Sequence, residues 1–335
     1  MIKTAVVGCG NVSKNHFHAL GLIDYIEITA VADIKPERAD EKARETGAKA
    51  YCDFDELLEK EELDCIHIVT PHYLHTSMAV KALMKGINVF LEKPCSVTAE
   101  EADALIKAEK RYGRQVGICF QNRYNESSIT AKEIIDSGRY GAVKGARAFV
   151  TWNRGADYYS DDWHGTADKE CGGVFINQAI HTLDLLQWFC GGCENITAHT
   201  FNDHLKGVIE VEDTVSALMD MKCGAKAVFY ATTASAVNSD VFIEIVMEKV
   251  TLRIEGEKLI KFENDTAEIL CDKSPEEFTG RSYWGHGHQA IIRDFYDCLK
   301  TGRQFSINAE EGAKAAKIVA AGYKSSKENI TVEVK

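Results

Sequence analysis

Residues Lys3–Ser13 read KTAVVGCGNVS, and this stretch decides the fold class. A β-branched run that fits a buried strand leads into two glycines, and a helical pattern follows from residue 14 to residue 22. Gly8 allows the tight turn after the strand, and Gly10 lets the backbone approach a phosphate group. Strand, glycine loop and helix in this order predict a dinucleotide-binding unit. The residues expected to line the dinucleotide are Gly8, Gly10, Asn11 and Val12.

Asp33, at the end of the second predicted strand Ile26–Ala32, strengthens this interpretation. Ser13 occupies the third glycine position of the motif, so the loop alone leaves a plain glycine turn as the alternative. An acid at this distance from the loop can accept hydrogen bonds from the hydroxyls of the adenosine ribose. The same carboxylate repels a 2′-phosphate, which favours NAD, while the nearby Lys35 and Arg38 leave room for NADP.

Strands and helices alternate from residue 1 to about residue 120, which predicts a doubly wound parallel sheet of the Rossmann type. The predicted strand Cys65–Val69 ends in Thr70 and Pro71, and His75 lies in the loop that begins the next helix. Ligands bind at the carboxyl ends of parallel strands. We therefore expect Thr70, Pro71 and His75 to form a wall of the cofactor site. No carboxylate or cysteine flanks the loop at ligand spacing, so we predict no metal there.

The stretch Val89–Pro94 reads VFLEKP, in which a buried strand ends in an acid, a base and a proline without a turn glycine. At the carboxyl end of a parallel strand, Lys93 would lie over the bound cofactor. Burial and the positive charge of an oxidised nicotinamide both favour a neutral lysine, so Lys93 is a candidate catalytic base. The alternative is that Glu92 and Lys93 are a solvated strand end.

The second part of the chain carries the period-two pattern of antiparallel strands joined by short connections. We expect the NAD(P)-binding domain to cover residues 1–121 and a substrate-binding and oligomerisation domain to cover residues 122–335. The polar cluster Gln121–Tyr124 follows the last strand of the first domain and suits the crossing between the two. The strands expected in the second domain are 145–152, 214–221, 225–232, 241–247 and 250–255, with an edge strand at 331–334.

A predicted helix from Val174 to Phe189 is the second functional element. Asn177, His181 and Asp184 share one face at spacings of 4 and 3 residues, while apolar residues cover the rest of the helix. A histidine between an amide and a carboxylate can move a proton, so His181 is the second catalytic candidate. A structural histidine in the core is the alternative.

The loop from Trp152 to Gly165 is rich in aromatic residues and hydrogen-bond donors. Such a loop suits a polyol or sugar, because a ring face stacks on aromatic side chains while the hydroxyls bind Arg154 and Tyr158. Arg154 equally suits a carboxylate or a phosphate. The alternative is an interaction loop at a subunit interface, where the same residue types are enriched.

These motifs together resemble the glucose-fructose oxidoreductase and inositol dehydrogenase family, often called Gfo/Idh/MocA. The resemblance spans nearly the whole chain, and the order of its motifs is specific. The residues that carry it are Gly8-Cys9-Gly10-Asn11, Asp33, Thr70-Pro71 with His75, Glu92-Lys93-Pro94, and Gly172-Gly173 followed by Asn177, His181 and Asp184.

The resemblance implies an α/β fold with a Rossmann domain and a C-terminal α+β domain that is built on a large, mostly antiparallel sheet. It implies an NAD(P)-dependent enzyme with Lys93 and His181 near the reacting carbon, and a cis peptide bond before Pro94. Further cofactor contacts are then expected from Glu92, Lys93 and Gln121. Substrate contacts are expected from Arg123, Arg154, Tyr158, Asn177, Asp184 and His288.

The implied reaction is hydride transfer between a nicotinamide and a secondary hydroxyl or ketone of a cyclic polyol, sugar or sugar derivative. A nucleotide-linked uronic acid is an alternative substrate. The aspartate that is frequent in this family four residues before the histidine is Asn177 here. This difference makes a cofactor-binding sensor or scaffold without turnover the alternative function.

Composition excludes several other classes of protein. A net charge of −12 argues against a general nucleic-acid or anionic-membrane surface, and no apolar run approaches the ~20 residues that span a membrane. Eleven cysteines without framework spacing indicate reduced thiols, and the one CxxC, Cys190 to Cys193, lies where a helix ends. Since no signal peptide precedes the first strand, we expect a cytoplasmic enzyme. We expect it to form a homodimer or homotetramer through the C-terminal sheet.

Overall fold

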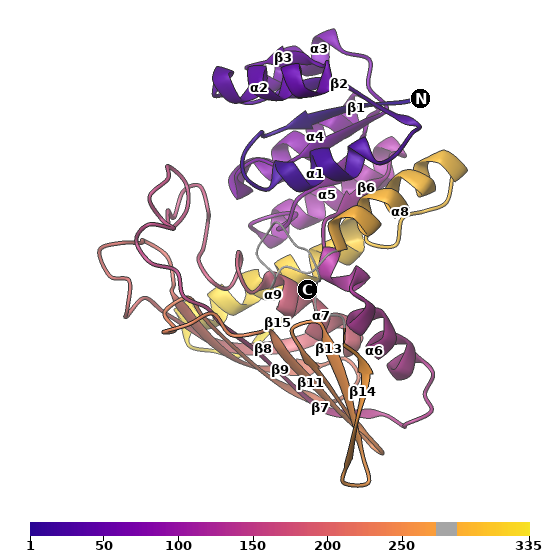
Figure 1. Ribbon diagram of the computed structural model, residues 1–335. Coiled ribbons are helices and arrows are strands. Elements are labelled where there is room, and N and C mark those ends of the chain that lie inside the picture. The colour runs from indigo at the N-terminus through magenta and orange to yellow at the C-terminus, as the bar shows by residue number, and fades with distance from the viewer. Residues whose placement is uncertain (273–286) are drawn as a thin grey trace. The chain divides into compact units, whose positions relative to one another are not determined.

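The computed structural model describes residues 1–272 and 287–335, which form two compact units (Figure 1). The first unit contains Met1–Phe120 and His288–Ala313, and the second contains Gln121–Gly287 and Lys314–Lys335. The sequence-based division placed all residues from 122 onward in one domain, whereas the chain returns to the first unit at His288. The segment directly before His288 contains Trp284 and His286, and these two residues lie outside the described residues.

The first unit is built on a parallel sheet of six strands in the order β3-β2-β1-β4-β5-β6 (Figure 1). Strands β4 and β6 are buried along their whole length, as expected for a sheet with both faces covered. This arrangement confirms the predicted Rossmann-type sheet. The strands are β1 Ile2–Val7, β2 Ile26–Ala32, β3 Lys49–Tyr51, β4 Cys65–Ile68, β5 Asn88–Leu91 and β6 Val116–Ile118.

Two of the helices between these strands begin at a side chain that caps them. The Asp53 side chain accepts the amide of Glu56, and the Thr98 hydroxyl accepts the amide of Glu101, so each satisfies an amide of the first turn. Pro36 opens its helix at a position where no amide is needed. The helices are α1 Ser13–Gly21, α2 Pro36–Thr46, α3 Phe54–Lys60, η1 His72–Leu74, α4 His75–Met84, α5 Ala99–Tyr112 and α8 Gly287–Thr301.

The second unit is built on a nine-stranded sheet in the order β14-β13-β12-β11-β7-β10-β9-β8-β15. Only the β7–β10 pair is parallel among the pairs of this sheet, so the predicted large, mostly antiparallel sheet is confirmed. The strands are β7 Val143–Thr151, β8 Cys193–Phe201, β9 Thr214–Met221, β10 Lys226–Thr232, β11 Phe242–Met247, β12 Thr251–Glu255, β13 Lys258–Glu263, β14 Thr266–Cys271 and β15 Val332–Glu333.

Helical segments of the second unit include the short turn η2 Gln121–Tyr124, α6 Glu126–Asp136 and α7 Ile180–Phe189. Helix α9, Ala309–Glu328, begins in the first unit and ends in the second. The α7 helix packs on β7 and β11, and its residues 182–187 are buried. The side chains on its first turn are therefore held by a rigid element.

The start of α7 differs from the sequence-based prediction, which began the helix at Val174. The amides of Gly173 and Phe175 each donate to the Glu212 carboxylate at 3.0 Å, and the Val174 amide donates to the Glu212 carbonyl at 3.1 Å. Residues 174–178 form turns, and Asn177 lies outside the helix. No local sequence signal marks Glu212 as the partner, since it lies 39 residues after Gly173.

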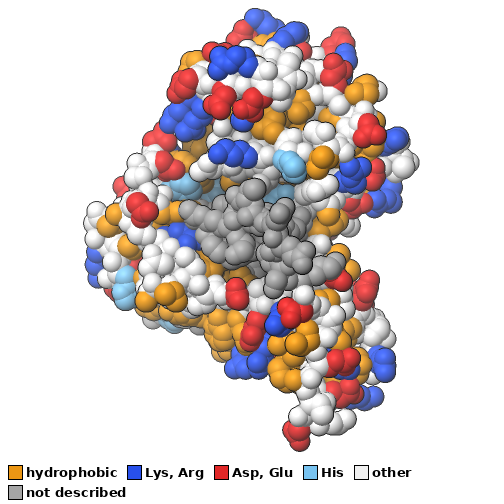
Figure 2. Space-filling view, in the orientation of Figure 1, with side chains coloured by type: hydrophobic (Ala, Val, Ile, Leu, Met, Phe, Trp, Pro, Cys, Tyr) orange, Lys and Arg blue, Asp and Glu red, His pale blue; other side chains and the backbone are white. Residues whose placement is uncertain are grey.

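The surface and the cysteines agree with the composition. The face drawn in Figure 2 carries acidic and basic side chains interspersed with each other. Within residues 1–272 and 287–335, no helix is both long enough and apolar enough to cross a membrane. All eleven cysteines lie within these ranges, and none of them forms a disulfide.

Candidate active site

The glycine loop after β1 has the geometry that a bound pyrophosphate needs. Gly8 has a φ of +93°, and a Cβ there would lie 2.3 Å from the carbonyl oxygen of Val69. Only glycine fits this position without strain. A Cβ at Gly10 would meet no atom within 4 Å, so open space adjoins the backbone there. The N-terminus of α1, at Val12, has no side-chain cap, which leaves its first-turn amides oriented toward that space.

Asp33 stands beside this loop, as the sequence predicted. Its Oδ2 accepts the amide of Cys9 at 2.8 Å, and its Oδ1 accepts the amide of Lys35 at 2.9 Å. Each carboxylate oxygen has further lone pairs, so Asp33 can also accept two ribose hydroxyls. The glycine loop, the uncapped helix and this oriented acid fit a dinucleotide.

The loops after β4 and β5 are joined through His75, which is buried. Its Nδ1 lies 2.7 Å from the carbonyl oxygen of Pro94, and its Nε2 lies 2.7 Å from the carbonyl oxygen of Thr70. Burial lowers the pKa of His75, although both carbonyls favour its charged form. His75 therefore fixes the loop walls of the cofactor site through their backbones. The Lys93–Pro94 peptide bond is cis, which confirms that prediction.

Glu92 is buried directly before Lys93, at the carboxyl end of β5. Its Oε2 accepts the backbone amide of Lys93 at 3.2 Å, and its Oε1 lies 3.0 Å from His16 Nε2. Burial alone raises the pKa of Glu92, but the hydrogen bond from His16 and the neighbouring positive charges outweigh it and hold the pKa below its ordinary value. The carboxylate is therefore ionised, and the peptide that carries Lys93 is fixed to it.

His288, predicted to contact substrate, lies on α8 in the first unit. Its Nε2 is 3.9 Å from Glu92 Oε1. Burial lowers the pKa of His288 to about 4, against the attraction of the Glu92 carboxylate. The structure thus places His288 beside the residue that precedes Lys93.

His181 lies in the first turn of α7, in the second unit. Its Nε2 is 3.4 Å from the Nε2 of Gln121, so the predicted cofactor contact and the predicted catalytic histidine are neighbours. The side chain of His181 is half-buried. The two residues bring a ring nitrogen and an amide to one place at the end of a buried helix.

Arg123 and Asp184, both predicted to contact substrate, bind each other. The guanidinium donates from Nε and Nη2 to the two carboxylate oxygens of Asp184, each at 2.6 Å. The side chains are 4% and 1% exposed. Gln187 also donates to this carboxylate at 3.2 Å. This bidentate buried pair anchors α7 to the η2 turn.

Asn177 is buried in the turn before α7 and donates from Nδ2 to Glu170 Oε1 at 2.5 Å. Glu170 also accepts the amide of Gly165, so it ties the aromatic loop to this turn. Glu170 and Glu212 are buried acids that sequence reasoning missed. The amide partners of Glu212 lie 37 and 39 residues away, whereas Gly165 and Asn177 lie near Glu170 in the sequence.

Arg154 and Tyr158 come together in the aromatic loop of the second unit. The guanidinium of Arg154 lies 5.0 Å from the Trp152 ring centroid and 5.3 Å from that of Tyr158. Its Nη1 donates to Asn238 Oδ1 at 2.8 Å. The hydroxyl of Tyr158 accepts a hydrogen bond from Gln178 at 3.3 Å. The guanidinium of Arg154 thus packs against the aromatic rings of Trp152 and Tyr158.

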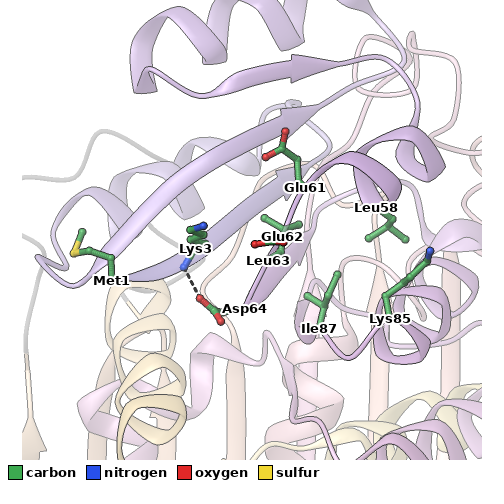
Figure 3. A pocket seen from close by; sticks show the side chains of 9 residues that line it. All are labelled: Met1, Lys3, Leu58, Glu61, Glu62, Leu63, Asp64, Lys85 and Ile87. Atoms are coloured by element: carbon green, nitrogen blue, oxygen red, sulfur yellow. Dashed lines mark hydrogen bonds between the residues drawn. The ribbon is translucent and has the colours of Figure 1, made fainter.

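A separate hollow lies at the other end of the parallel sheet (Figure 3). Its lining includes Lys3, Glu61, Asp64 and Lys85, and the Lys3 amide donates to Asp64 at 2.8 Å. Lys3 is near the start of β1 and Asp64 directly precedes β4. The candidate residues of the glycine loop and of the loops after β4 and β5 follow the carboxyl ends of the strands, whereas this hollow lies at the amino ends. The hollow is therefore not part of their site.

Comparisons with known proteins agree with the geometry of the two units. Residues 2–120 match the family described as "Oxidoreductase family, NAD-binding Rossmann fold", and residues 128–253 match the GFO/IDH/MocA C-terminal domain. D-apiose dehydrogenase from Paraburkholderia graminis is 25% identical, with 99% of this chain and 90% of that protein covered. The scyllo-inositol 2-dehydrogenase of Bacillus subtilis is 25% identical, with 94% of this chain and 93% of that protein covered.

Solved structures give the same result. The WlbA dehydrogenase from Bordetella pertussis, crystallised with NADH and UDP-GlcNAcA, is 28% identical to this chain, with a TM-score of 0.88. The similarity covers 100% of this chain and 99% of that structure. The glycine loop and Asp33 fit the cofactor that these relatives bind. The chain therefore belongs to the Gfo/Idh/MocA family of NAD-dependent dehydrogenases.

Proposed function

We propose that the protein oxidises a secondary hydroxyl of a cyclic polyol, sugar or sugar derivative, or reduces the corresponding ketone. The observation that carries this proposal is Lys93, fixed to the ionised Glu92 at a strand end of the same unit as the glycine loop and Asp33. NAD, when bound, supplies the hydride acceptor or donor. The protein's own residues must then remove or deliver the hydroxyl proton.

We propose Lys93 as the group that takes this proton. Its amide is held by Glu92, so the backbone from which its side chain extends cannot rotate freely. We assign His181 the role of a second proton acceptor or relay, because an imidazole changes charge near neutral pH and Gln121 lies within 3.4 Å of it. Gly8, Gly10, Asn11, Val12, Asp33, Thr70, Pro71 and Gln121 are proposed to hold the cofactor.

A nucleotide-linked sugar acid is the second candidate substrate. It is supported by the similarity to WlbA, which extends over the whole chain, and by Arg154, whose guanidinium can bind a carboxylate or a phosphate. Tyr158 adds a ring on which a sugar or a base can stack. An inositol or a free sugar needs no such cation, so the two candidates differ in their dependence on Arg154.

The test is NADH absorbance with a substrate panel that contains scyllo-inositol, D-apiose, hexoses and UDP-GlcNAcA. We expect turnover with at least one member, and Arg154→Met to raise KM strongly only if the substrate is anionic. A protein that binds NADH by calorimetry but turns over no member in either direction would support the sensor or scaffold instead.

Asp33 is expected to make NAD(H) bind at least about tenfold more tightly than NADP(H). Two like charges 4 Å apart repel by ~1 kcal/mol in bulk water and by more near a protein surface, and ~1.4 kcal/mol is a factor of ten. Calorimetry with both cofactors measures the ratio. Asp33→Ser should reduce the discrimination, and equal affinity of the native protein for both cofactors would contradict the assignment.

We also propose that the open face of the nine-stranded sheet joins copies of this chain. Leu218 and Val228 are cross-strand partners on this face and are 53% and 46% exposed, and Val246 and Ile269 are exposed too. An apolar face of this kind marks an interaction surface. Light scattering should give a dimer or tetramer, and Leu218→Glu should lower the mass, whereas Met84→Glu, at an equally exposed site of the first unit, should not.

A further inference from the structure

A run of buried polar side chains crosses the first unit. His16 Nδ1 lies 2.8 Å from His67 Nδ1, and His67 Nε2 lies 2.9 Å from the hydroxyl of Tyr296. That hydroxyl lies 2.9 Å from the Thr4 hydroxyl. All four side chains are fully buried and come from α1, β4, α8 and β1. Since buried polar groups are costly unless they are paired, a series of four such side chains inside a core requires an explanation.

This series of hydrogen-bonded side chains ends at Glu92. The other ring nitrogen of His16, Nε2, lies 3.0 Å from Glu92 Oε1, so His16 bridges Glu92 and His67. Glu92 is thereby connected to four elements of the unit. The titratable and charged groups around its carboxylate are His16 on α1, His67 on β4, His75 at the start of α4, Lys93 next in the sequence, His288 on α8 and Cys119 after β6.

The side chains of this hydrogen-bonded series differ in charge. Burial, together with the charge of His16, lowers the pKa of His67 well below its ordinary value, so His67 is neutral. Burial raises the pKa of Tyr296, so its phenol keeps its proton. Neither His67 nor Tyr296 therefore offers a positive charge to pair with the Glu92 carboxylate. His16 is in hydrogen-bond contact with Oε1 of that carboxylate, as the Lys93 amide is with Oε2, and His67 with Tyr296 fixes the plane of the His16 ring.

We propose that His16 is a positioning residue of the dehydrogenase: held by His67 and Tyr296, it keeps the Glu92 carboxylate ionised and oriented toward the Lys93 amide. His16 touches neither substrate nor the reacting atoms in this assignment, and it acts on the reaction only through Glu92 and the peptide of Lys93. The inference deepens the proposed function and rests on it, because Lys93 is taken there as the base.

His16→Phe tests the assignment through the pH profile. Without His16, Glu92 loses one hydrogen bond but keeps the Lys93 amide, so the desolvation cost of burial, which raises the pKa of a carboxyl group, is offset less. Its ionised form then exists only at higher pH, so the acid limb of kcat/KM should move to higher pH by about one unit or more, with ~10-fold or greater loss of kcat at neutral pH. NAD(H) affinity should change by less than about threefold, because Asp33 and the glycine loop are untouched.

Three further variants separate positioning from a general loss of structure. His16→Gln keeps an amide donor and should restore part of the activity. His67→Phe leaves His16 in place but removes its support, and should give a smaller shift in the same direction. The matched control is His18→Phe, two positions along the same helix at an exposed site, which should behave like the native protein.

A double-mutant cycle that combines His16→Phe with Glu92→Gln measures the coupling energy between His16 and Glu92. In the Glu92→Gln background no carboxylate is left to position, so adding His16→Phe should cost little further activity. An equal loss in both backgrounds would overturn the proposal, as would a His16→Phe profile that matches the native one after scaling.

Infrared spectroscopy gives a readout that needs no substrate. Below neutral pH, the spectrum of His16→Phe minus that of the native protein should show an additional carbonyl stretch of a protonated carboxylic acid. This additional band should vanish in the double variant with Glu92→Gln. If the native protein turned over no substrate, the proposed function would fail while this measurement still decided the role of His16. Absence of the protonated band in a folded His16→Phe protein would refute that role.

Discussion

Lys93→Ala is expected to lower kcat by more than about a hundredfold while the fold persists, as for the loss of a general base. A hundredfold loss corresponds to ~2.7 kcal/mol of transition-state stabilisation. The Glu92 carboxylate accepts the backbone amide of residue 93, so alanine keeps this bond and the local backbone. NAD(H) binding should therefore survive, and the loss should appear in kcat.

Steady-state kinetics on the substrate found in the panel, with circular dichroism and calorimetry on the same preparation, make this measurement. The matched control is Lys85→Ala, an exposed lysine directly after α4, which should retain native kinetics. Near-native turnover in Lys93→Ala, combined with its abolition in His181→Ala, would show that the two roles are reversed.

Asp184→Ala is expected to lower the free energy of unfolding by ~3–5 kcal/mol, because it leaves the Arg123 guanidinium buried without its bidentate partner. Urea unfolding measures this loss. The comparison is Asp220→Ala, which breaks the exposed pair with Lys226 and should cost ~0–1 kcal/mol. Replacing both members of the buried pair, with Arg123→Met and Asp184→Leu, should recover much of the stability.

The same variant distinguishes the two interpretations of Asp184. If the carboxylate contacts substrate, Asp184→Ala should raise KM in a protein of nearly native stability. If it anchors α7, stability should fall first, and the conservative Asp184→Asn should retain part of it by keeping one acceptor and the shape of the side chain. A loss of less than about 1 kcal/mol would contradict the anchoring role.

Much of the first unit could be predicted because its signals are local. The glycine loop, Asp33 and the sequence Glu92-Lys93-Pro94 each lie within a few residues of a strand end, and strand ends are readable from the apolar pattern. The cis peptide bond before Pro94 was expected from the family resemblance, which the sequence Glu92-Lys93-Pro94 helps to carry.

The features that sequence reasoning missed depend on contacts between distant residues. Helix α7 begins at Ile180, and Glu212 binds the amides of Gly173 and Phe175 before it, a contact that no pattern near residue 174 reports. His67 gave a weak signal as a polar residue in an apolar strand, but its partners His16 and Tyr296 are 51 and 229 residues away. The return of α8 to the first unit is likewise a matter of topology.

This return determines when the first unit can finish folding on the ribosome. The amide of Ile118 on β6 donates to the carbonyl of Ile307 at 2.9 Å, and a Cβ at Gly117 would lie 2.6 Å from the Phe295 ring. The edge of the Rossmann sheet therefore stays open after residue 120 has been made. At ~5–20 residues per second, the segment that closes it emerges ~10–40 s later. Throughout that interval the nascent chain carries an exposed strand edge, and strands β7 to β14 of the second sheet are synthesised before that edge is covered.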